Sequence, residues 1–232
     1  MKAFLLAAGE GTRLRPLTDS LPKCLVPIRD VPLLEIWLQL CRRAGISEVL
    51  INLHSHSDAV KEFVASRDFG IRVRLFDEPV LLGSAGTIAA NRDWIQNDPY
   101  FWVLYADVLT NMDLSKMLRA HLELNLAATL GVYQVPNPCQ CGILELDDAS
   151  IIRNFEEKPQ KPKSDLAFSG VMIGTPKFVR QIPSGMPADI GFHVLPKLSG
   201  SMRAYVTDEY LLDIGTMEKY ATAQQTWPGL AS

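Results

Sequence analysis

Residues 6–23 read LAAGEGTRLRPLTDSLPK, and this stretch determines how the rest of the sequence is interpreted. It begins within the apolar run 3–7, which predicts a short strand buried on both faces. A loop directly after a first strand lies where open α/β sheets bind their ligands. Gly9 and Gly11 allow the backbone to approach phosphate groups, and free N–H groups in such a loop form an anion-binding nest.

Positive charge gathers in the same stretch. Arg13, Arg15 and Lys23 lie close together in a chain of 232 residues with a formal net charge of -3. This balance excludes a globally basic nucleic-acid binder but not a local basic patch around an anion. The stretch is therefore a candidate phosphate-binding loop.

Three interpretations of the loop compete. Gly9 and Gly11 match the first two glycines of the dinucleotide fingerprint Gly-x-Gly-x-x-Gly, but Leu14 occupies the third position. The P-loop pattern Gly-x-x-x-x-Gly-Lys-Ser/Thr is absent. The third interpretation is a structural turn that carries solvated arginines.

Strand and helix patterns alternate through the first half of the chain. Beyond the first strand, the sequence predicts strands at 48–53, 71–76, 101–105 and 127–133, and helices at 32–44, 58–66, 85–96 and 114–124. Gly45 is the expected stop after the first of these helices. This alternation predicts an α/β fold with a mostly parallel sheet and helices on both faces.

The second half has a different pattern. Strands are predicted at 142–146, 151–155 and 167–173, and helices at 176–181, 189–198 and 217–225, with a strand pair at 204–206 and 210–213. The first three strands read as hairpin-like additions. With no linker or repeat visible, we expect a single domain over 1–232, with a substrate-side elaboration after about residue 140.

Cysteines and apolar runs limit the remaining classes. Cys24 and Cys41 have apolar neighbours and are expected to behave as small hydrophobes, while Cys139 and Cys141 lie in a turn-like stretch without further metal ligands nearby. No run approaches the roughly 18 apolar residues of a membrane span, and no signal peptide is recognisable. A cytoplasmic protein with neither membrane nor nucleic-acid partners is expected.

Six segments together resemble the sugar-1-phosphate nucleotidyltransferases, the nucleotide-sugar pyrophosphorylases. They are residues 6–23, 82–87, 105–107, 156–159, 168–171 and 212–216. The motifs are most similar to those of the mannose-1-phosphate and heptose-1-phosphate guanylyltransferases. The resemblance implies a Rossmann-like, GT-A-like fold: a mostly parallel, mixed sheet flanked by helices, with a small sugar-binding β elaboration. It also implies a nucleotide-binding half at about 1–140 and a sugar-phosphate-binding half at about 141–232.

The resemblance also implies a role for each matching residue. Arg13, Lys23 and Asp107 would be catalytic, and Asp107 and Asp213 would hold Mg²⁺, although Asp213 could instead cap the following helix. The nucleotide would contact Ala7, Ala8, Gly9, Gly11, Thr12, Arg13, Gly83, Ser84, Gly86 and Thr87. The sugar phosphate would contact Glu157, Lys158, Ser169 and Gly170.

Two departures from the family pattern are visible. Ala106 stands where the family often has glycine, and the Phe-Ser-Gly strand at 168–170 replaces the more common Asn-Ala-Gly. The second change removes an expected hydrogen bond to the sugar. His193 and the Cys139–Cys141 loop match nothing in the family pattern.

The implied reaction is nucleotidyl transfer from an NTP to a sugar-1-phosphate. The Gly-Ser-Ala-Gly segment at 83–86 favours GTP, and mannose-1-phosphate or manno-heptose-1-phosphate is the favoured acceptor. Thymidylyl, uridylyl or cytidylyl transfer to another sugar phosphate or to phosphocholine stays open, as does a non-catalytic regulatory homologue. Leu14 disfavours an oxidoreductase. The sequence is compatible with a homodimer but fixes neither the oligomeric state nor the sugar.

Overall fold

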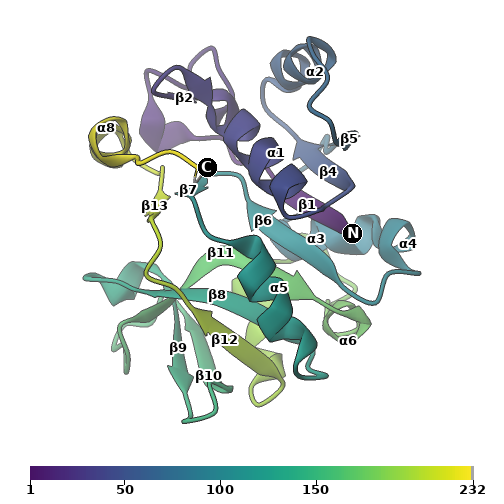
Figure 1. Ribbon diagram of the computed structural model, residues 1–232, viewed down its shortest axis with the longest axis vertical. Coiled ribbons are helices and arrows are strands. Elements are labelled where there is room, and N and C mark those ends of the chain that lie inside the picture. The colour runs from purple at the N-terminus through teal and green to yellow at the C-terminus, as the bar shows by residue number, and fades with distance from the viewer. Residues whose placement is uncertain (231–232) are drawn as a thin grey trace. The chain divides into compact units, whose positions relative to one another are not determined.

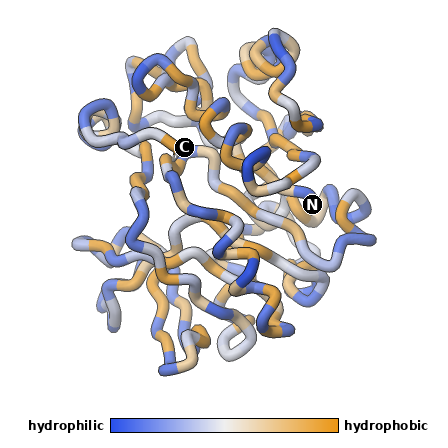
Figure 2. Tube along the Cα trace, in the orientation of Figure 1, coloured by the Kyte–Doolittle hydropathy of each residue, from blue (hydrophilic) through white to orange (hydrophobic). Residues whose placement is uncertain are grey.

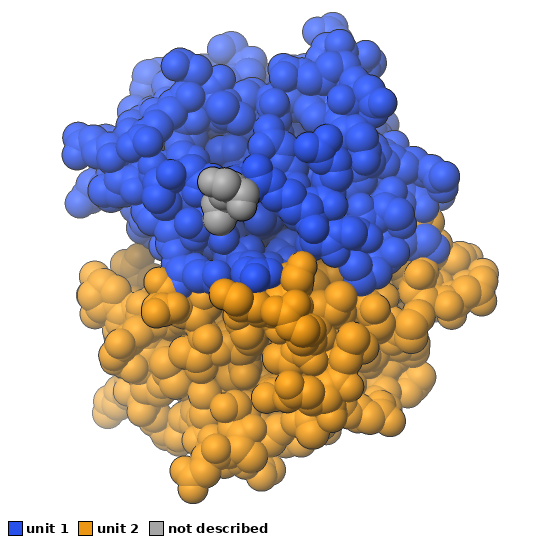
Figure 3. Space-filling view, viewed as in Figure 1, with its two compact units in different colours: residues 1–81, 104–114, 209–232 blue, residues 82–103, 115–208 orange. Residues whose placement is uncertain are grey.

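The computed structural model describes residues 1–230 (Figure 1). The chain divides into two compact units, shown in different colours in Figure 3. Unit 1 comprises Met1–Leu81, Leu104–Leu114 and the chain from Glu209 onward, and unit 2 comprises Leu82–Val103 and Ser115–Asp208. The expectation of a single domain divided near residue 140 stays a prediction.

Unit 1 contains a three-stranded parallel arrangement. The strands are β1 (Lys2–Leu6), β4 (Glu48–Leu53) and β5 (Arg72–Asp77), in the order β1-β4-β5. Leu6 is in register with Asn52, and Asn52 with Phe76. The central residues of β1 and β4 are buried and apolar, as a strand covered on both faces requires.

Helices accompany these strands in the predicted alternation. α1 (Leu33–Arg43) follows β3, and α2 (Ser57–Ala65) joins β4 to β5. Hydrophobic and hydrophilic residues alternate along α1 at helical spacing (Figure 2). Gly45, with φ +73, lies directly after the C-cap of α1, which confirms the predicted stop.

Short elements complete unit 1. β2 (Pro27–Ile28) pairs with β3 (Val31–Pro32), and β7 (Val108–Thr110) pairs antiparallel with β13 (Leu211–Asp213). The remaining elements are the 3-10 turns η1 (Thr12–Leu14) and η2 (Lys23–Leu25) and helix α8 (Met217–Thr226). Strand β6 (Phe101–Tyr105) has residues in both units.

Unit 2 is built mainly from antiparallel pairs, as the hairpin-like pattern predicted. β9 (Gly142–Leu146) pairs with β10 (Ile152–Glu157) and with β11 (Leu166–Gly174). β11 also pairs antiparallel with β8 (Ala128–Gln134), which pairs in parallel with β12 (Met202–Val206). The whole is the α/β fold with a mixed sheet that the sequence predicts.

The helices of unit 2 are short. They are α3 (Ser84–Ala90), α4 (Arg92–Ile95), α5 (Leu114–Leu122, whose first residue belongs to unit 1), α6 (Pro176–Val179) and α7 (Ile190–His193), with the 3-10 turns η3 (Pro138–Gln140) and η4 (Leu195–Leu198). In residues 1–230 no helix is both long and apolar enough to cross a membrane.

Three element predictions are wrong. The strands near 204–206 and 210–213 do not pair with each other, because β12 pairs with β8 and β13 with β7. The helix predicted at 85–96 is broken at Asn91, whose φ of -114° and ψ of 20° leave the helical range. The helix predicted at 189–198 ends at His193, and Pro196 belongs to the separate 3-10 turn η4.

Two cysteine expectations can be compared directly with the structure. Cys24 and Cys41 are 2% and 0% exposed, and burial raises the pKa of each thiol to about 12. They behave as small core hydrophobes, as expected. Cys139 is exposed and Cys141 is half-buried.

Candidate functional site

The glycine loop leaves β1 along a fixed path. The Ala7 backbone N–H donates to Asn52 Oδ1 at 2.7 Å, so this amide is not free for a ligand. Gly11 has φ +65, and a Cβ added to it would lie 3.1 Å from Thr18 Cγ2 and 3.2 Å from Lys23 Cβ. The Thr18 hydroxyl donates to the Gly11 carbonyl at 2.8 Å. Glycine is therefore required at position 11 for both its backbone angle and its space.

The exposed part of the loop lies beyond this anchored start. Gly9, Thr12 and Arg13 are exposed, whereas Ala8 is buried. A Cβ added to Gly9 would meet no atom within 4 Å. The surface available to a ligand is thus formed by Gly9 and the residues around η1.

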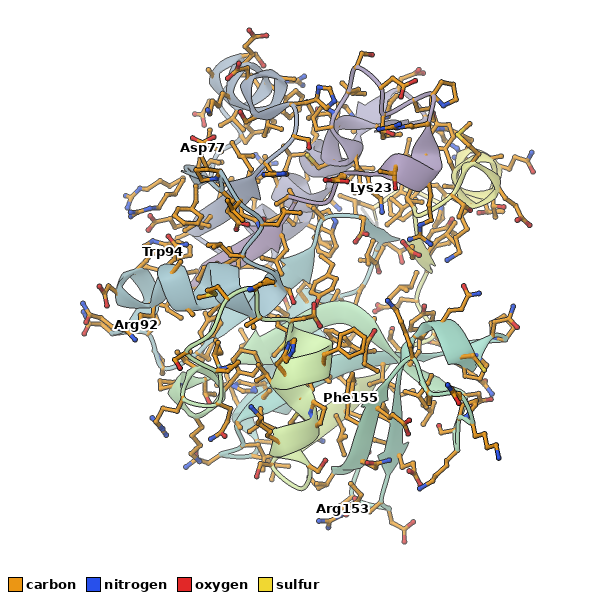
Figure 4. The ribbon with its side chains drawn as sticks, turned by 180° about the vertical axis from the view of Figure 1, so that it is seen from behind. Lys23, Asp77, Arg92, Trp94, Arg153 and Phe155 are labelled. Atoms are coloured by element: carbon orange, nitrogen blue, oxygen red, sulfur yellow. The ribbon has the colours of Figure 1, made fainter. Side chains whose placement is uncertain are left out.

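Lys23 and Asp107 form an ion pair. Lys23 Nζ lies 2.7 Å from Asp107 Oδ2, and the Lys23 side chain is only 11% exposed. Lys23 begins η2, and Asp107 occupies the turn between β6 and β7. Lys23, which belongs to the segment Met1–Leu81 of unit 1, is labelled in Figure 4. The structure thus brings together two residues that the motifs placed 84 positions apart.

Asp213 lies beside Asp107. It ends β13 in register with Val108, and the Ile214 N–H donates to the Asp107 carbonyl at 2.8 Å. A Cβ added to Gly215 would lie 2.9 Å from Asp213 Oδ2 and 3.3 Å from Arg13 Nη2. The structure therefore gathers Arg13, Asp107 and Asp213 at one place in unit 1.

One residue of this cluster is absent from the sequence predictions. Lys219 Nζ contacts Asp213 Oδ2 at 2.9 Å from the first turn of α8. The cap of α8 is Thr216, whose hydroxyl accepts from the Lys219 N–H at 3.3 Å, so the alternative role of Asp213 as a helix cap is wrong. A lysine in the first helical turn carries no sequence signal that would single it out.

The two aspartates fit the donor chemistry of Mg²⁺. Mg²⁺ prefers carboxylate oxygens and keeps several positions for water or substrate phosphate. Within residues 1–230 no group of three or more His, Cys, Asp or Glu side chains could hold a metal ion. A site made from Asp107 and Asp213 would therefore need phosphate oxygens to complete it.

In the second glycine segment, residues 82–87 of unit 2, backbone hydrogen bonds connect the start of α3 to Ala188. The Ala188 carbonyl accepts from the Ala85 and Gly86 N–H groups at 2.9 and 3.0 Å, and the Ala188 N–H donates to the Leu82 carbonyl at 2.9 Å. Gly83 has φ +78, and a Cβ there would overlap the Ala188 carbonyl oxygen. The Ala85 and Gly86 amides, in a segment that the resemblance assigns to nucleotide binding, are thus already hydrogen bonded.

The Ser84 hydroxyl is also engaged. It donates to Asp189 Oδ2 at 2.8 Å and accepts from the Ile190 N–H at 2.8 Å. Asp189 Oδ1 accepts from the Gly191 and Phe192 N–H groups, so Asp189 caps α7. Asp189 thereby ties the start of α3 to the start of α7.

Glu157 ends β10 in a confined position. A Cβ added to Gly142 would lie 2.7 Å from Glu157 Oε2, and one added to Gly191 would overlap the same oxygen. The pKa of Glu157 is raised, mainly by burial and further by the negative charge of Asp189, while Lys158 opposes the shift. Packing against these glycines explains why the carboxylate is partly desolvated.

Lys158 follows Glu157 with φ 51. Its N–H donates to the Cys141 carbonyl at 2.9 Å, and its Nζ lies 5.9 Å from the centroid of the Phe192 ring. Phe192 is 55% exposed, so the lysine head lies over an open aromatic face.

Ser169 and Gly170 occupy an irregularity in β11. The register with β8 shifts between Phe168 and Met172, and Gly170 has φ +79. Ser169 is 2% exposed, and its Oγ accepts from the Val171 N–H at 3.2 Å. The hydroxyl thus supports its own bulge, and a sugar contact at Ser169 stays a prediction.

The negative charge of Asp189 gives a prediction for Glu157. We expect Asp189→Asn to lower the pKa of the Glu157 carboxyl, because it removes a negative charge while asparagine retains the helix cap. The measurement is an NMR titration of the Glu157 carboxyl carbon. Asp165→Asn, which changes an exposed partner of Gln134, is the matched control and leaves the titration unchanged.

The sign of the pH dependence follows from the raised pKa. Protonation of Glu157 favours the folded state, so this contribution to stability is present at low pH and is lost as pH rises through the folded pKa. Asp189→Asn therefore reduces that low-pH contribution. A Glu157 titration that moves to higher pH, or does not move, contradicts the electrostatic assignment.

The α/β fold places a glycine loop directly after β1. Two basic residues, Arg13 and Lys23, and two aspartates, Asp107 and Asp213, lie beside this loop. These are features of a nucleotide-binding protein. The sequence matches the family described as Nucleotidyl transferase over residues 2–228, and the chain belongs to this family.

Two curated relatives illustrate the range within this family. The chain is 31% identical to a UTP--glucose-1-phosphate uridylyltransferase of Synechocystis sp., over 95% of this chain and 61% of the relative. It is also 31% identical to a mannose-1-phosphate guanylyltransferase catalytic subunit beta of Xenopus tropicalis, over 96% of this chain and 63% of the relative. The chain thus spans about three-fifths of the length of these relatives.

Solved structures show the same fold. HddC from Yersinia pseudotuberculosis complexed with GMP-PN superposes with a TM-score of 0.81 at 24% identity, covering 97% of this chain and 99% of that chain. A UDP-glucose pyrophosphorylase from Acinetobacter baumanii gives a TM-score of 0.82 at 22% identity, covering 97% and 92%.

Proposed function

We propose that the protein transfers a nucleotidyl group from an NTP to a sugar-1-phosphate and releases pyrophosphate. The observation that carries this proposal is the cluster of Arg13, Lys23, Asp107 and Asp213 beside the glycine loop in unit 1. Family membership and relatives that are guanylyl-, uridylyl- and thymidylyltransferases support the same reaction class.

The reaction needs charge stabilisation more than proton transfer. An oxygen of the sugar phosphate, already anionic, attacks the α-phosphorus, and the bond from that phosphorus to the bridging oxygen of the β-phosphate breaks. No general base is required, so positioning of the two anions and stabilisation of the α-phosphoryl group determine the rate. On this proposal, Arg13 contacts the triphosphate, and Gly11 and Thr12 donate backbone N–H groups to it.

The acidic pair and its lysine complete the proposed phosphate site. Asp107 and Asp213 would hold Mg²⁺, which when bound neutralises phosphate charge and acts as a Lewis acid. Lys23 would lie near the α-phosphate, and its ion pair with Asp107 fixes its position. Lys219 fixes Asp213 in the same way.

In unit 2, Glu157 and Lys158 are the proposed sugar-phosphate residues. Lys158 would bind the phosphate as a point charge, and the Glu157 carboxylate would accept hydrogen bonds from sugar hydroxyls. The glycine contacts of Glu157 leave its carboxylate little freedom to move, which suits a positioning role.

The proposed substrates are GTP and mannose-1-phosphate or a manno-heptose-1-phosphate. The support for GTP is the Gly-Ser-Ala-Gly segment at 83–86 and the mannose-1-phosphate guanylyltransferases among the relatives. The uridylyl and thymidylyl relatives are also 31% identical to this chain, so sequence identity supports the other bases equally. A homodimer and a cytoplasmic location belong to the same proposal.

Pyrophosphate release tests the proposed reaction. The protein is incubated with Mg²⁺, each of the five common NTPs and a panel of hexose and heptose 1-phosphates, and released pyrophosphate is measured. Release with GTP and a manno-configured phosphate is the expected result. Release only with another NTP would replace the proposed base. No release with any pair, combined with a thermal shift by a nucleotide-sugar, would favour a regulatory homologue.

A further inference from the structure

Two buried polar side chains lie beneath the start of the glycine loop. Asn52 is 4% exposed and Glu78 is 3% exposed. Asn52 Oδ1 accepts from the Ala7 N–H at 2.7 Å, and Asn52 Nδ2 donates to Glu78 Oε1 at 3.0 Å. The result is a continuous path of hydrogen bonds from the backbone of the loop to a buried carboxylate.

The backbone around this path is held by neighbouring strands. Asn52 is in register with Leu6 of β1, directly before Ala7. Glu78 follows β5, and its N–H donates to the Leu53 carbonyl at 2.7 Å. The Glu78 carbonyl lies 2.7 Å from His54 Nδ1. The Glu78 backbone is therefore held at its N–H by Leu53 of β4 and at its carbonyl by His54, the residue after β4.

A carboxylate can select the orientation of a carboxamide. The Asn52 side chain has an acceptor end and a donor end, and the Ala7 N–H needs the acceptor end. Glu78 Oε1 accepts from Asn52 Nδ2, so Glu78 faces the donor end of the Asn52 carboxamide. Glu78 thus keeps the Asn52 oxygen directed at Ala7.

We propose that Asn52 and Glu78 are positioning residues for the nucleotide-binding loop. By fixing the Ala7 amide, they set the direction in which the chain leaves β1 and hence where Gly9, Gly11 and Arg13 lie. Neither side chain contacts the substrate in this proposal. The inference rests on the proposed function, in which that loop binds the NTP phosphates.

Three variants of similar shape test the proposal. In Asn52→Asp, an oxygen replaces Nδ2 and two carboxylates face each other, so the KM for GTP is expected to rise about tenfold or more. In Glu78→Gln, the side chain can still present an oxygen to Asn52, and the KM changes by less than about threefold. The double variant restores complementarity, because the new amide at position 78 would donate to the new carboxylate at position 52. Its KM is expected to return to within about threefold of the wild type.

The kinetic pattern separates positioning from general destabilisation. The KM for the sugar phosphate is expected to stay unchanged in all three variants, and unfolding is followed for each. Asn154 donates to Glu145 Oε1 at 2.8 Å in unit 2, so Asn154→Asp is a matched control that leaves the GTP KM unchanged. The proposal is overturned if the Asn52→Asp variant has the wild-type KM for GTP. It is also overturned if the KM of the double variant is as high as that of Asn52→Asp.

A second readout does not depend on turnover. Hydrogen exchange of the Ala7 amide, followed by NMR, is expected to accelerate about tenfold in Asn52→Asp and to recover in the double variant. If the wild type releases no pyrophosphate but this exchange pattern holds, the proposed function fails and the anchoring of the loop stands. If the wild type is active and the Ala7 exchange rate is identical in all variants, the positioning inference fails and the function stands.

Discussion

Asp107→Asn is expected to lower kcat by about a thousandfold, equivalent to roughly 4 kcal/mol of transition-state stabilisation. On the proposed mechanism the change removes one carboxylate of the metal pair and the ionic partner of Lys23 at 2.7 Å. The measurement is the rate of pyrophosphate release at saturating GTP and sugar phosphate.

The fold is expected to survive this substitution. The Asp107 side chain is 38% exposed. The Ile214 N–H donates to the backbone carbonyl of Asp107, and asparagine retains this carbonyl. The control is Asp77→Asn, which changes an exposed ion pair with Lys61 at 2.9 Å and is expected to leave turnover unchanged (Figure 4). If the kcat of the Asp107→Asn variant were within tenfold of the wild-type value, the proposed metal role of Asp107 would be refuted.

Gly83→Ala is expected to lower the free energy of unfolding by about 3 kcal/mol or more. Residue 83 has φ +78 and ψ 162, a region that is essentially restricted to glycine, and an added Cβ would overlap the Ala188 carbonyl oxygen. Moving that carbonyl would break its hydrogen bonds to Ala85 and Gly86 at the start of α3. Urea denaturation with a probe in unit 2 measures the loss.

Gly185→Ala is the matched control for this prediction. A Cβ added to Gly185 meets no atom within 4 Å, and its φ does not lie in the positive range. Its expected effect on the free energy of unfolding is below about 1 kcal/mol. Equal urea midpoints for the two alanine variants would contradict this prediction, because they would show that the Ala188 backbone can move to accommodate the added methyl group.

The sequence predicts the elements of the fold well where local signals are strong. Gly45 stops α1 as expected, and the apolar runs of β1 and β4 are buried strands. The wrong strand pair arises because strand pairing is decided at long range. β7 and β13 have three residues each, and nothing in residues 211–213 identifies 108–110 as their partner.

The candidate site shows the same division. The family resemblance of the motifs singled out Arg13, Lys23, Asp107 and Asp213, and the structure gathers them in unit 1. It did not predict Asn52 and Glu78, because a single polar residue at the end of an apolar strand carries no information about its partner. The nucleotide contacts that the resemblance implies at 83–87 stay a prediction, and the Ala85 and Gly86 amides donate to Ala188, about 100 residues later in the chain.

The discontinuous composition of unit 1 has a consequence for synthesis on the ribosome. Asp213 and the β13 strand that pairs with β7 belong to the last segment of the chain. A nascent chain lacking that segment contains the glycine loop, Lys23 and Asp107, but not the second aspartate or Lys219. The acidic pair is therefore assembled only after the segment from Glu209 has been synthesised, when a contact between distant parts of the chain closes. Any nucleotide captured earlier would be held by an incomplete site.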